Sequence, residues 1–286
     1  MPSVRQIARR IRSVENTAKI TKAMSMIAAS KLRRTQDAAT RGRSYADNMA
    51  QMVSNVMSQI DDESGSQSLA EEREINNIGL IVITPDRGLT GGLNSNILRA
   101  TGDFIGGQSV PVKIVACGKK GRDYSRRSDI EIIDELLGIG DRPSSAETQP
   151  VSVAMMNAFE NGDVDSVFVS YAKFVNTTSQ RPVIDQLVPV VPVDLEVSNS
   201  AGYIFEPDAN EVLSQLLPRY FQTVVHQAIL EANASEQSAR MVAMNQATDN
   251  ANAMVDDLTL VMNKLRQETI TKELLDIVGG VSAVES

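Results

Sequence analysis

The sequence predicts an α/β domain inserted between two long helices, one at each end of the chain, that form an antiparallel coiled coil. Apolar and small residues repeat at alternating steps of three and four from Val4 to Ile60, and the spacing returns from Asn210 to about Val278. Between these stretches, short apolar runs alternate with helical patterns, as in a parallel sheet. The predicted boundaries are 1–60 for the first helix, 61–75 for a linker, 76–200 for the α/β domain and 201–286 for the second helix.

The first helix has an unusual seam. No proline interrupts residues 3–60, so a single helix of about 55 residues, roughly 80 Å long, is the simplest interpretation. Small residues let a partner helix approach closely but bury less apolar area than Leu or Ile. The middle of the seam is of this kind, with Ala18, Thr21, Ser25 and Ala28. A second apolar stripe lies off the seam and needs another cover, namely Ile20, Met24 and Ile27.

The middle of the chain shows the alternation of a parallel sheet. Continuous apolar runs predict buried strands at Ile78–Ile83, Val112–Ala116 and Val164–Val175. Helical patterns follow or precede them at Asn96–Ile105 and Val151–Glu160. This order predicts a Rossmann-like domain. Residues 183–197 are also strand-like, but nearby prolines confine them to a sheet edge or an extended connection.

The second helix is longer than the first. Its seam is predicted at Met244, Ala247, Ala251, Met254, Leu258, Val261 and Leu265. If both helices leave the α/β domain together, the second extends about 15–20 residues further, or roughly 25–30 Å. The end of this helix keeps an apolar set, Ile270, Leu274, Ile277, Val278 and Val281. Because a lone helix with such a set is an aggregation hazard, we expect it to enter another protein.

Charge is distributed unevenly. The net charge is −8, yet residues 1–43 hold eleven Lys and Arg against Glu15 and Asp37. A basic arm on an acidic body fits nucleic acid, an anionic surface or an acidic protein. The arm offers only Tyr45 for base stacking, and the acidic body would repel phosphates. We therefore predict an acidic protein partner and no nucleic acid.

The sequence offers little for catalysis. One cysteine, Cys117, and one histidine, His226, are too few for a disulfide, a typical zinc site or a histidine-based triad. Asp86–Asn94 and Gly118–Arg122 follow strands, where phosphate loops occur, but their spacing fits no phosphate-binding motif. We interpret their glycines as backbone devices, with anion binding as the alternative. We predict no catalytic residue, cofactor or metal, and no membrane span or secretory signal.

Several segments, in order along the chain, resemble the gamma subunits of F-type ATP synthases. They are IRSVENTAKITKAMSMIAASKLRR (Ile11–Arg34), DRGLTGGLN (Asp86–Asn94), SEQSARMVAMNQATDNA (Ser235–Ala251) and ITKELLDIVGGVSA (Ile270–Ala283). The resemblance covers essentially the whole chain. Gly280-Val281 stands where the family usually has Gly-Ala, and the paired-cysteine insert of chloroplast members is missing, so thiol regulation is not expected.

The resemblance implies a non-catalytic rotor shaft that couples proton flow to ATP synthesis or hydrolysis in the beta subunits. Its coiled coil would stand inside the ring of alpha and beta subunits, and its body would contact epsilon and the c-ring. It would lie peripherally on the cytoplasmic face of a bacterial plasma membrane. Positions matching the ring interface are Lys22, Met24, Arg240, Gln267, Thr271 and Glu273, joined by the apolar Leu274 and Ile277. Positions resembling the region near the c-ring and epsilon are Tyr203 and Glu206.

Two other classes of function remain open from the residues alone. The first is an α/β enzyme or nucleotide-binding protein whose coiled-coil arms serve oligomerisation. The second is a nucleic-acid adaptor that uses the basic arm. Copurification discriminates between the rotor shaft and an enzyme. A shaft should copurify with its ring subunits, whereas an enzyme should be active alone.

Overall fold

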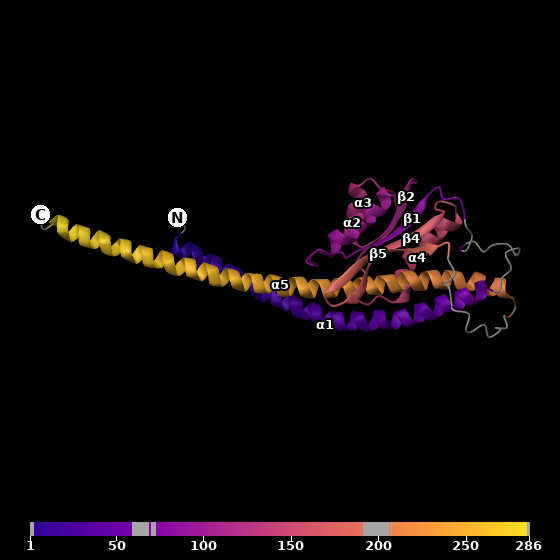
Figure 1. Cartoon of the computed structure of the whole chain (residues 1–286), viewed down its shortest axis with the longest axis horizontal. Helices are drawn as coiled ribbons and strands as arrows, with labels where there is room; N and C mark the ends of the chain where they lie inside the picture. Colours follow the sequence, from indigo (N-terminus) through magenta and orange to yellow (C-terminus); the bar gives the residue numbers. More distant parts are fainter. Residues whose placement is uncertain (1–2, 59–68, 70–72, 191–205, 207, 285–286) are drawn as a thin grey trace. The chain divides into compact units, whose positions relative to one another are not determined.

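The computed structural model describes residues 3–58, 69, 73–190, 206 and 208–284. The chain divides into a coil unit, Met1–Ile27 with Met241–Ser286, and a body unit, Ala28–Arg240. Its helices are α1 (Val4–Met57), α2 (Leu93–Gly106), α3 (Lys119–Arg127), α4 (Ser145–Glu160) and α5 (Ala209–Val284) (Figure 1). Its strands are β1 (Ile78–Ile83), β2 (Val112–Cys117), β3 (Ile132–Leu136), β4 (Ser166–Asn176) and β5 (Ser179–Val188). The predicted fold class, two long packed helices around an α/β sheet, is confirmed.

In the coil unit, α1 packs on α5 along the seam that the sequence predicts for α1. Ile7, Ile11 and Ala18 are buried. Polar pairs continue the seam: the hydroxyl oxygens of Thr21 and Thr248 lie 2.7 Å apart, and the Ser25 hydroxyl donates to the Asn245 side chain. From Thr21 to Ser25 the residue number rises along α1, while that of the partner on α5 falls from Thr248 to Asn245. The two helices are therefore antiparallel. Small hydroxyl-bearing residues thus permit a close approach while satisfying their own polar groups.

The predicted seam of α5 is partly wrong. Met254 and Val261 are each 45% exposed, and their neighbours Val255 and Met262 are half-buried instead. The side chains that face α1 at these turns are Met244, Thr248, Ala251, Val255, Leu258, Met262 and Leu265. Both registers have three-four spacing and apolar members, so spacing alone does not separate them. The contact between the Thr21 and Thr248 hydroxyls favours the observed register, because it places Thr248 of α5 in the seam.

The body unit is built on a five-stranded sheet of order β3-β2-β1-β4-β5. β1 pairs in parallel with β2 and β4, β2 pairs in parallel with β3, and β4 pairs antiparallel with β5. Every residue of β1 is buried, as expected of a central strand covered on both faces. β5 forms one edge and contains Pro182, so the edge position expected from the prolines holds for residues 183–188, whereas 191–197 lie outside the described residues.

Helices cover both faces of the sheet. Ile81 and Ile83 of β1 belong to a core cluster that also contains Phe159 of α4 and Phe221 of α5. Leu80 and Val82 point the opposite way, as strand alternation requires, and belong to a second cluster against which Phe104 of α2 packs. Figure 1 shows α2 and α3 on one side of the sheet, with α4 and α5 on the other.

Two elements of the body unit were missed by the sequence analysis, and a third begins earlier than predicted. β3 is a half-exposed edge strand whose apolar run is interrupted by Asp134 and Glu135, and α3 is polar with a glycine inside. α4 begins at Ser145 because Ser144 and Glu147 form a capping box, each side chain bonding the other's backbone N–H. These hydrogen bonds lower the pKa of the Glu147 carboxyl. Local polar signals, rather than apolar periodicity, therefore define these elements.

Polar contacts also join α1 to α5 within the body unit. The Arg43 guanidinium lies 2.8 Å from Glu231, whose side chain is only 4% exposed. The Gln227 amide donates to the Ala39 carbonyl oxygen at 2.9 Å. Because a buried carboxylate without its partner is costly, these contacts favour one axial position of α1 on α5 over its neighbours.

Gly118 lies between β2 and α3, where its backbone approaches Thr84 closely. Its φ is +102°, and an added Cβ would lie 1.9 Å from the Thr84 carbonyl oxygen. We expect Gly118→Ala to lower the free energy of unfolding by about 3 kcal/mol or more, from backbone strain and overlap together. Gly88→Ala is the matched control, since its Cβ would meet nothing within 4 Å. Denaturant unfolding of both variants checks this, and equal losses would contradict it.

Candidate functional site

The coil unit presents basic and apolar side chains away from its seam. On α1, Ile20 is 61% exposed and Ile27 58% exposed, whereas Met24 is half-buried. The exposed Lys22 lies between them and lines, with Lys19 and Asp256 among others, a groove of about 540 Å³ between α1 and α5. The expected second stripe is therefore open to a partner at Ile20 and Ile27.

The end of α5 is exposed on all its described sides. Leu265 is half-buried, and every described side chain from Arg266 to Ile277 is exposed. This segment, residues 266–277, is called the α5 tip below. Its predicted interface residues are Gln267, Thr271, Glu273, Leu274 and Ile277, with Leu274 58% and Ile277 63% exposed. Because α1 begins at Val4 and runs antiparallel, no part of the described α1 is left to cover this tip.

Arg240 is engaged within the body unit. Its guanidinium donates to the Glu236 carboxylate at 2.7 Å, one helical turn away on α5, and its side chain is 13% exposed. The same nitrogen lies 3.5 Å from the Gly88 carbonyl oxygen in the Asp86–Asn94 turn. Arg240 therefore lies in the body unit, whereas Lys22 and Met24 lie in the coil unit.

The Asp86 carboxylate occupies the N-terminus of α3, the kind of position at which other proteins bind phosphate. It accepts from the Lys119 backbone N–H at 2.8 Å and from the Gly138 N–H at 2.9 Å. The Gly121 N–H donates to the Thr84 hydroxyl at 2.8 Å. The backbone donors of Gly118–Arg122 thus have internal acceptors, which favours the backbone interpretation of these glycines over anion binding. In the Asp86–Asn94 turn, the positive φ angles belong to Leu89 and Gly91.

α5 fills the edge of the sheet where α/β enzymes usually bind ligands, at the carboxyl ends of the strands. Ile229, Asn233 and Glu236 of α5 line a cavity of only about 30 Å³ beside the ends of β1 and β2. The Ser235 hydroxyl donates to the Ala172 carbonyl oxygen of β4 at 2.8 Å. The space left is of the order of one or two water molecules.

The single histidine and cysteine have structural surroundings. His226 Nδ1 lies 2.9 Å from the Thr148 hydroxyl, and burial lowers the pKa of its imidazole. Cys117 is 1% exposed, and burial raises the pKa of its thiol to about 12, so the reactive thiolate is scarce at neutral pH. Across the part of the chain that the structure describes, no group of three His, Cys, Asp or Glu could hold a metal ion.

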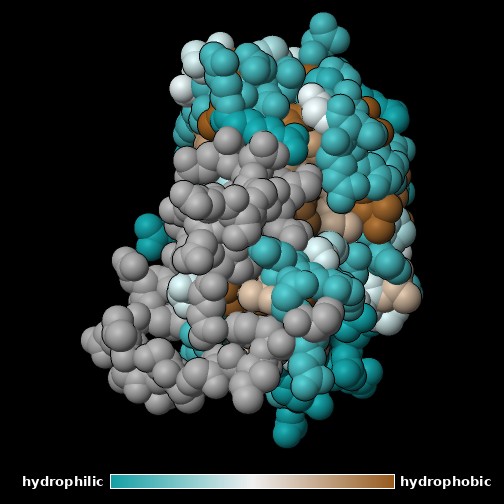
Figure 2. Space-filling model, turned by 90° about the vertical axis from the view of Figure 1, so that its right-hand side faces the viewer, coloured by the Kyte–Doolittle hydropathy of each residue, from teal (hydrophilic) through white to brown (hydrophobic). Residues whose placement is uncertain are grey.

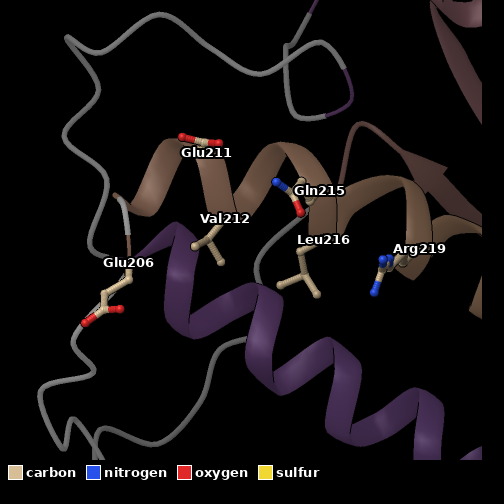
Figure 3. A pocket seen from close by; sticks show the side chains of 6 residues that line it. All are labelled: Glu206, Glu211, Val212, Gln215, Leu216 and Arg219. Carbon is tan, nitrogen blue, oxygen red and sulfur yellow. The ribbon is translucent and has the colours of Figure 1, made fainter.

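The start of α5 forms a shallow hollow of about 200 Å³ (Figure 3). It is lined by Glu206, Glu211, Val212, Gln215, Leu216 and Arg219. Val212 and Leu216 point toward α1, whereas Glu211 points away from it. The predicted residue Glu206 lies at this hollow and is exposed, and Tyr203 lies outside the described residues. On the side seen in Figure 2, hydrophilic residues cover much of the described surface.

The structure thus gathers some predicted site residues and separates others. The α5 tip brings together Gln267, Thr271, Glu273, Leu274 and Ile277 on one exposed segment. Sequence reasoning missed Asp86 and Glu236 as functional candidates. The i, i+4 spacing of Glu236 and Arg240 is a readable signal for a helical ion pair, but nothing in the sequence places Asp86 at the start of α3.

Comparisons with known proteins assign the family. The family model for ATP synthase matches residues 3–284. The chain is 47% identical to the ATP synthase gamma chain of Dehalococcoides mccartyi over 284 residues, which are 99% of this chain and all of that one. It is 43% identical to the gamma chain of Chloroflexus aurantiacus over 290 residues, covering all of both chains.

A solved structure agrees in fold. A chain of the Euglena gracilis mitochondrial ATP synthase, from a structure of its OSCP, F1 and c-ring, aligns with a TM-score of 0.68 at 17% identity, over 98% of this chain and 94% of that one. None of the helices in the described residues is long and apolar enough to cross a membrane. Packed antiparallel helices, an inserted sheet and the full-length sequence match lead to one conclusion: the chain belongs to the ATP synthase gamma-chain family.

Proposed function

We propose that this chain is the central-stalk rotor of an F-type ATP synthase and that its α5 tip and α1 stripe contact the ring of alpha and beta subunits. The exposed α5 tip carries this proposal. Ile270, Leu274 and Ile277 are 47%, 58% and 63% exposed in the chain by itself. Burying each such side chain contributes roughly 1.5–3 kcal/mol, so a surrounding apolar sleeve stabilises the assembly.

Rotation of such a shaft couples to catalysis through differential contact. The coil unit bears Lys22 and the exposed Ile20 and Ile27 on α1, while its α5 partner bears the acidic Asp256 and Asp257. As this asymmetric surface turns, each beta subunit meets a different side of it. Each contact favours a different conformation of that beta subunit, and these conformations differ in their affinity for nucleotide. The chain supplies the contact, and the ATP chemistry takes place in the beta subunits.

The body unit is proposed to contact the epsilon subunit and the c-ring through the region around Glu206 and Tyr203. The resemblance of these positions to the family supports this, as does the hollow at the start of α5. Through those contacts the chain is peripheral to the membrane, on the cytoplasmic side of a bacterial plasma membrane. Copurification tests the assignment: the chain should emerge with alpha and beta subunits, in fewer copies than either.

The filled sheet edge predicts that the purified chain does not bind MgATP tightly. α5 occupies the ligand edge of the sheet, and Asp86 accepts from the first N–H of α3, that of Lys119. Calorimetry with MgATP on the full chain should therefore show no micromolar binding. Micromolar binding that Asp86→Ala altered would favour the nucleotide-binding enzyme over the rotor.

Changing Leu274 and Ile277 together to Asp should separate assembly from folding. Both side chains are exposed in the chain alone, so its melting temperature should hardly change. Incorporation into a reconstituted complex with alpha and beta subunits should fall strongly, because charged groups would enter an apolar contact. Ile7→Asp is the contrasting variant, since Ile7 is 6% exposed in the seam and its loss should lower the melting temperature. A large drop for the tip variant with normal assembly would exclude the proposed contact.

Reversing the charges of Lys19 and Lys22 to Glu should weaken coupling. Both ammonium groups are exposed on α1 and are proposed to face acidic loops of the ring, where complementary charge guides contact. Single exposed pairs are weak, so the double change is the informative one. Proton pumping per ATP hydrolysed should fall, and more so at low salt. Lys173→Glu makes the same type of change at an exposed side chain of β4 in the body unit and should leave coupling normal.

A further inference from the structure

Two carboxylates of the body unit, Asp86 and Asp141, act electrostatically on a third, Glu236, which holds Arg240. Glu236 on α5 lines the small cavity beside β1 and β2 together with Asp86. Asp141, in the loop before α4, also repels the Glu236 carboxylate and accepts from the Gln237 amide at 3.1 Å. These acids come from the turn after β1, the loop between β3 and α4, and α5, so the tertiary fold alone brings them together.

Glu236 and Arg240 connect α5 to the Asp86–Asn94 turn. The Arg240 guanidinium is held at 2.7 Å by Glu236 and lies 3.5 Å from the Gly88 carbonyl oxygen. The turn presents Leu89, which is 59% exposed and has a φ of +65°, a backbone conformation that leucine seldom adopts. A strained and exposed apolar residue persists only where neighbouring contacts hold it. Arg240 supplies one of those contacts.

The charges facing Glu236 make its ionised form costly. Burial is the main cause that raises the pKa of this carboxyl, with Asp141 and Asp86 adding repulsion, while Arg240 opposes the change. Lys31 of α1 faces the same cluster but is committed to Asp141 at 2.7 Å. From β2, the nearby Cys117 thiol has a pKa raised to about 12 and stays neutral. Glu236 therefore takes up a proton at a higher pH than an ordinary glutamate does.

We propose that Glu236 is a protonation-dependent positioning residue: as a carboxylate it fixes Arg240 against the Asp86–Asn94 turn, and protonation loosens that turn. The proton comes from solvent and binds a carboxylate oxygen of Glu236, which then no longer carries the charge that holds the guanidinium. The contact is complete above the raised pKa of Glu236 and is lost as the pH falls through it. Presentation of Leu89 thereby depends on pH.

A spin label at position 89 measures this in the full chain, without ring subunits, so the outcome is independent of the rotor proposal. Leu89→Cys can be labelled selectively because the thiol of Cys117 is buried. The mobile fraction of the label, read by electron paramagnetic resonance, should at least about double between roughly pH 8 and pH 5, with a midpoint above the ordinary glutamate value. Circular dichroism at each pH establishes that the fold persists.

Three variants in the labelled background sharpen the test. Glu236→Gln, which is nearly isosteric, should give the mobile, pH-independent spectrum at every pH. Asp141→Asn should move the midpoint to lower pH, because it removes a repelling charge. Glu211→Gln, an exposed carboxylate at the start of α5, should keep the parental profile. A flat parental profile, or a Glu236→Gln chain with the parental pH dependence, would overturn the proposal.

Discussion

The packing of α5 is the interaction on which the rest of this structure depends. Within the body unit, its side chains complete the core under the sheet, with Phe221 and Val225 buried beside Phe159 of α4. In the coil unit, it provides the surface on which the seam of α1 is buried. A helix of 76 residues cannot be stable alone over its whole length without such partners. The composition of each covered segment of α5 therefore matches its partner, which is the sheet core in the body unit and α1 in the coil unit.

The small residues of the two seams follow from this constraint. Ala18 and Ala28 of α1 and Ala251 of α5 are buried, although alanine contributes little apolar area. Their advantage is a close approach of the two backbones, at which Thr21 and Thr248 can meet directly. This part-buried pair costs little because each hydroxyl has a partner. Registers in which a hydroxyl would be buried without a partner are disfavoured. The seam thus buries less apolar area than one of larger residues would, but it sets the axial register of the two helices.

In the described part of the body unit, α5 covers the sheet edge at which α/β folds commonly bind ligands. Parallel strands end at an edge that commonly binds nucleotides, but here α5 lies across that edge and Asp86 accepts from the backbone N–H groups of Lys119 and Gly138. A carboxylate of the chain itself replaces the anion of a cofactor. The same contacts fasten the Asp86–Asn94 turn, so elements that would hold a ligand in an enzyme instead hold a surface loop in position.

The sequence by itself determined the long helices, the buried strands β1, β2 and β4, and the exposed apolar tip. These features follow from periodicity and from chain length, which are local or additive properties. Tertiary structure decided the rest. Met254 and Val255 are equally apolar neighbours, so only contact with α1 sets which is buried. β3 has no strong apolar run and forms as the partner of β2. Asp86, Asp141 and Glu236 are far apart in the chain, and the first two repel the Glu236 carboxylate only because the sheet, a loop and α5 converge.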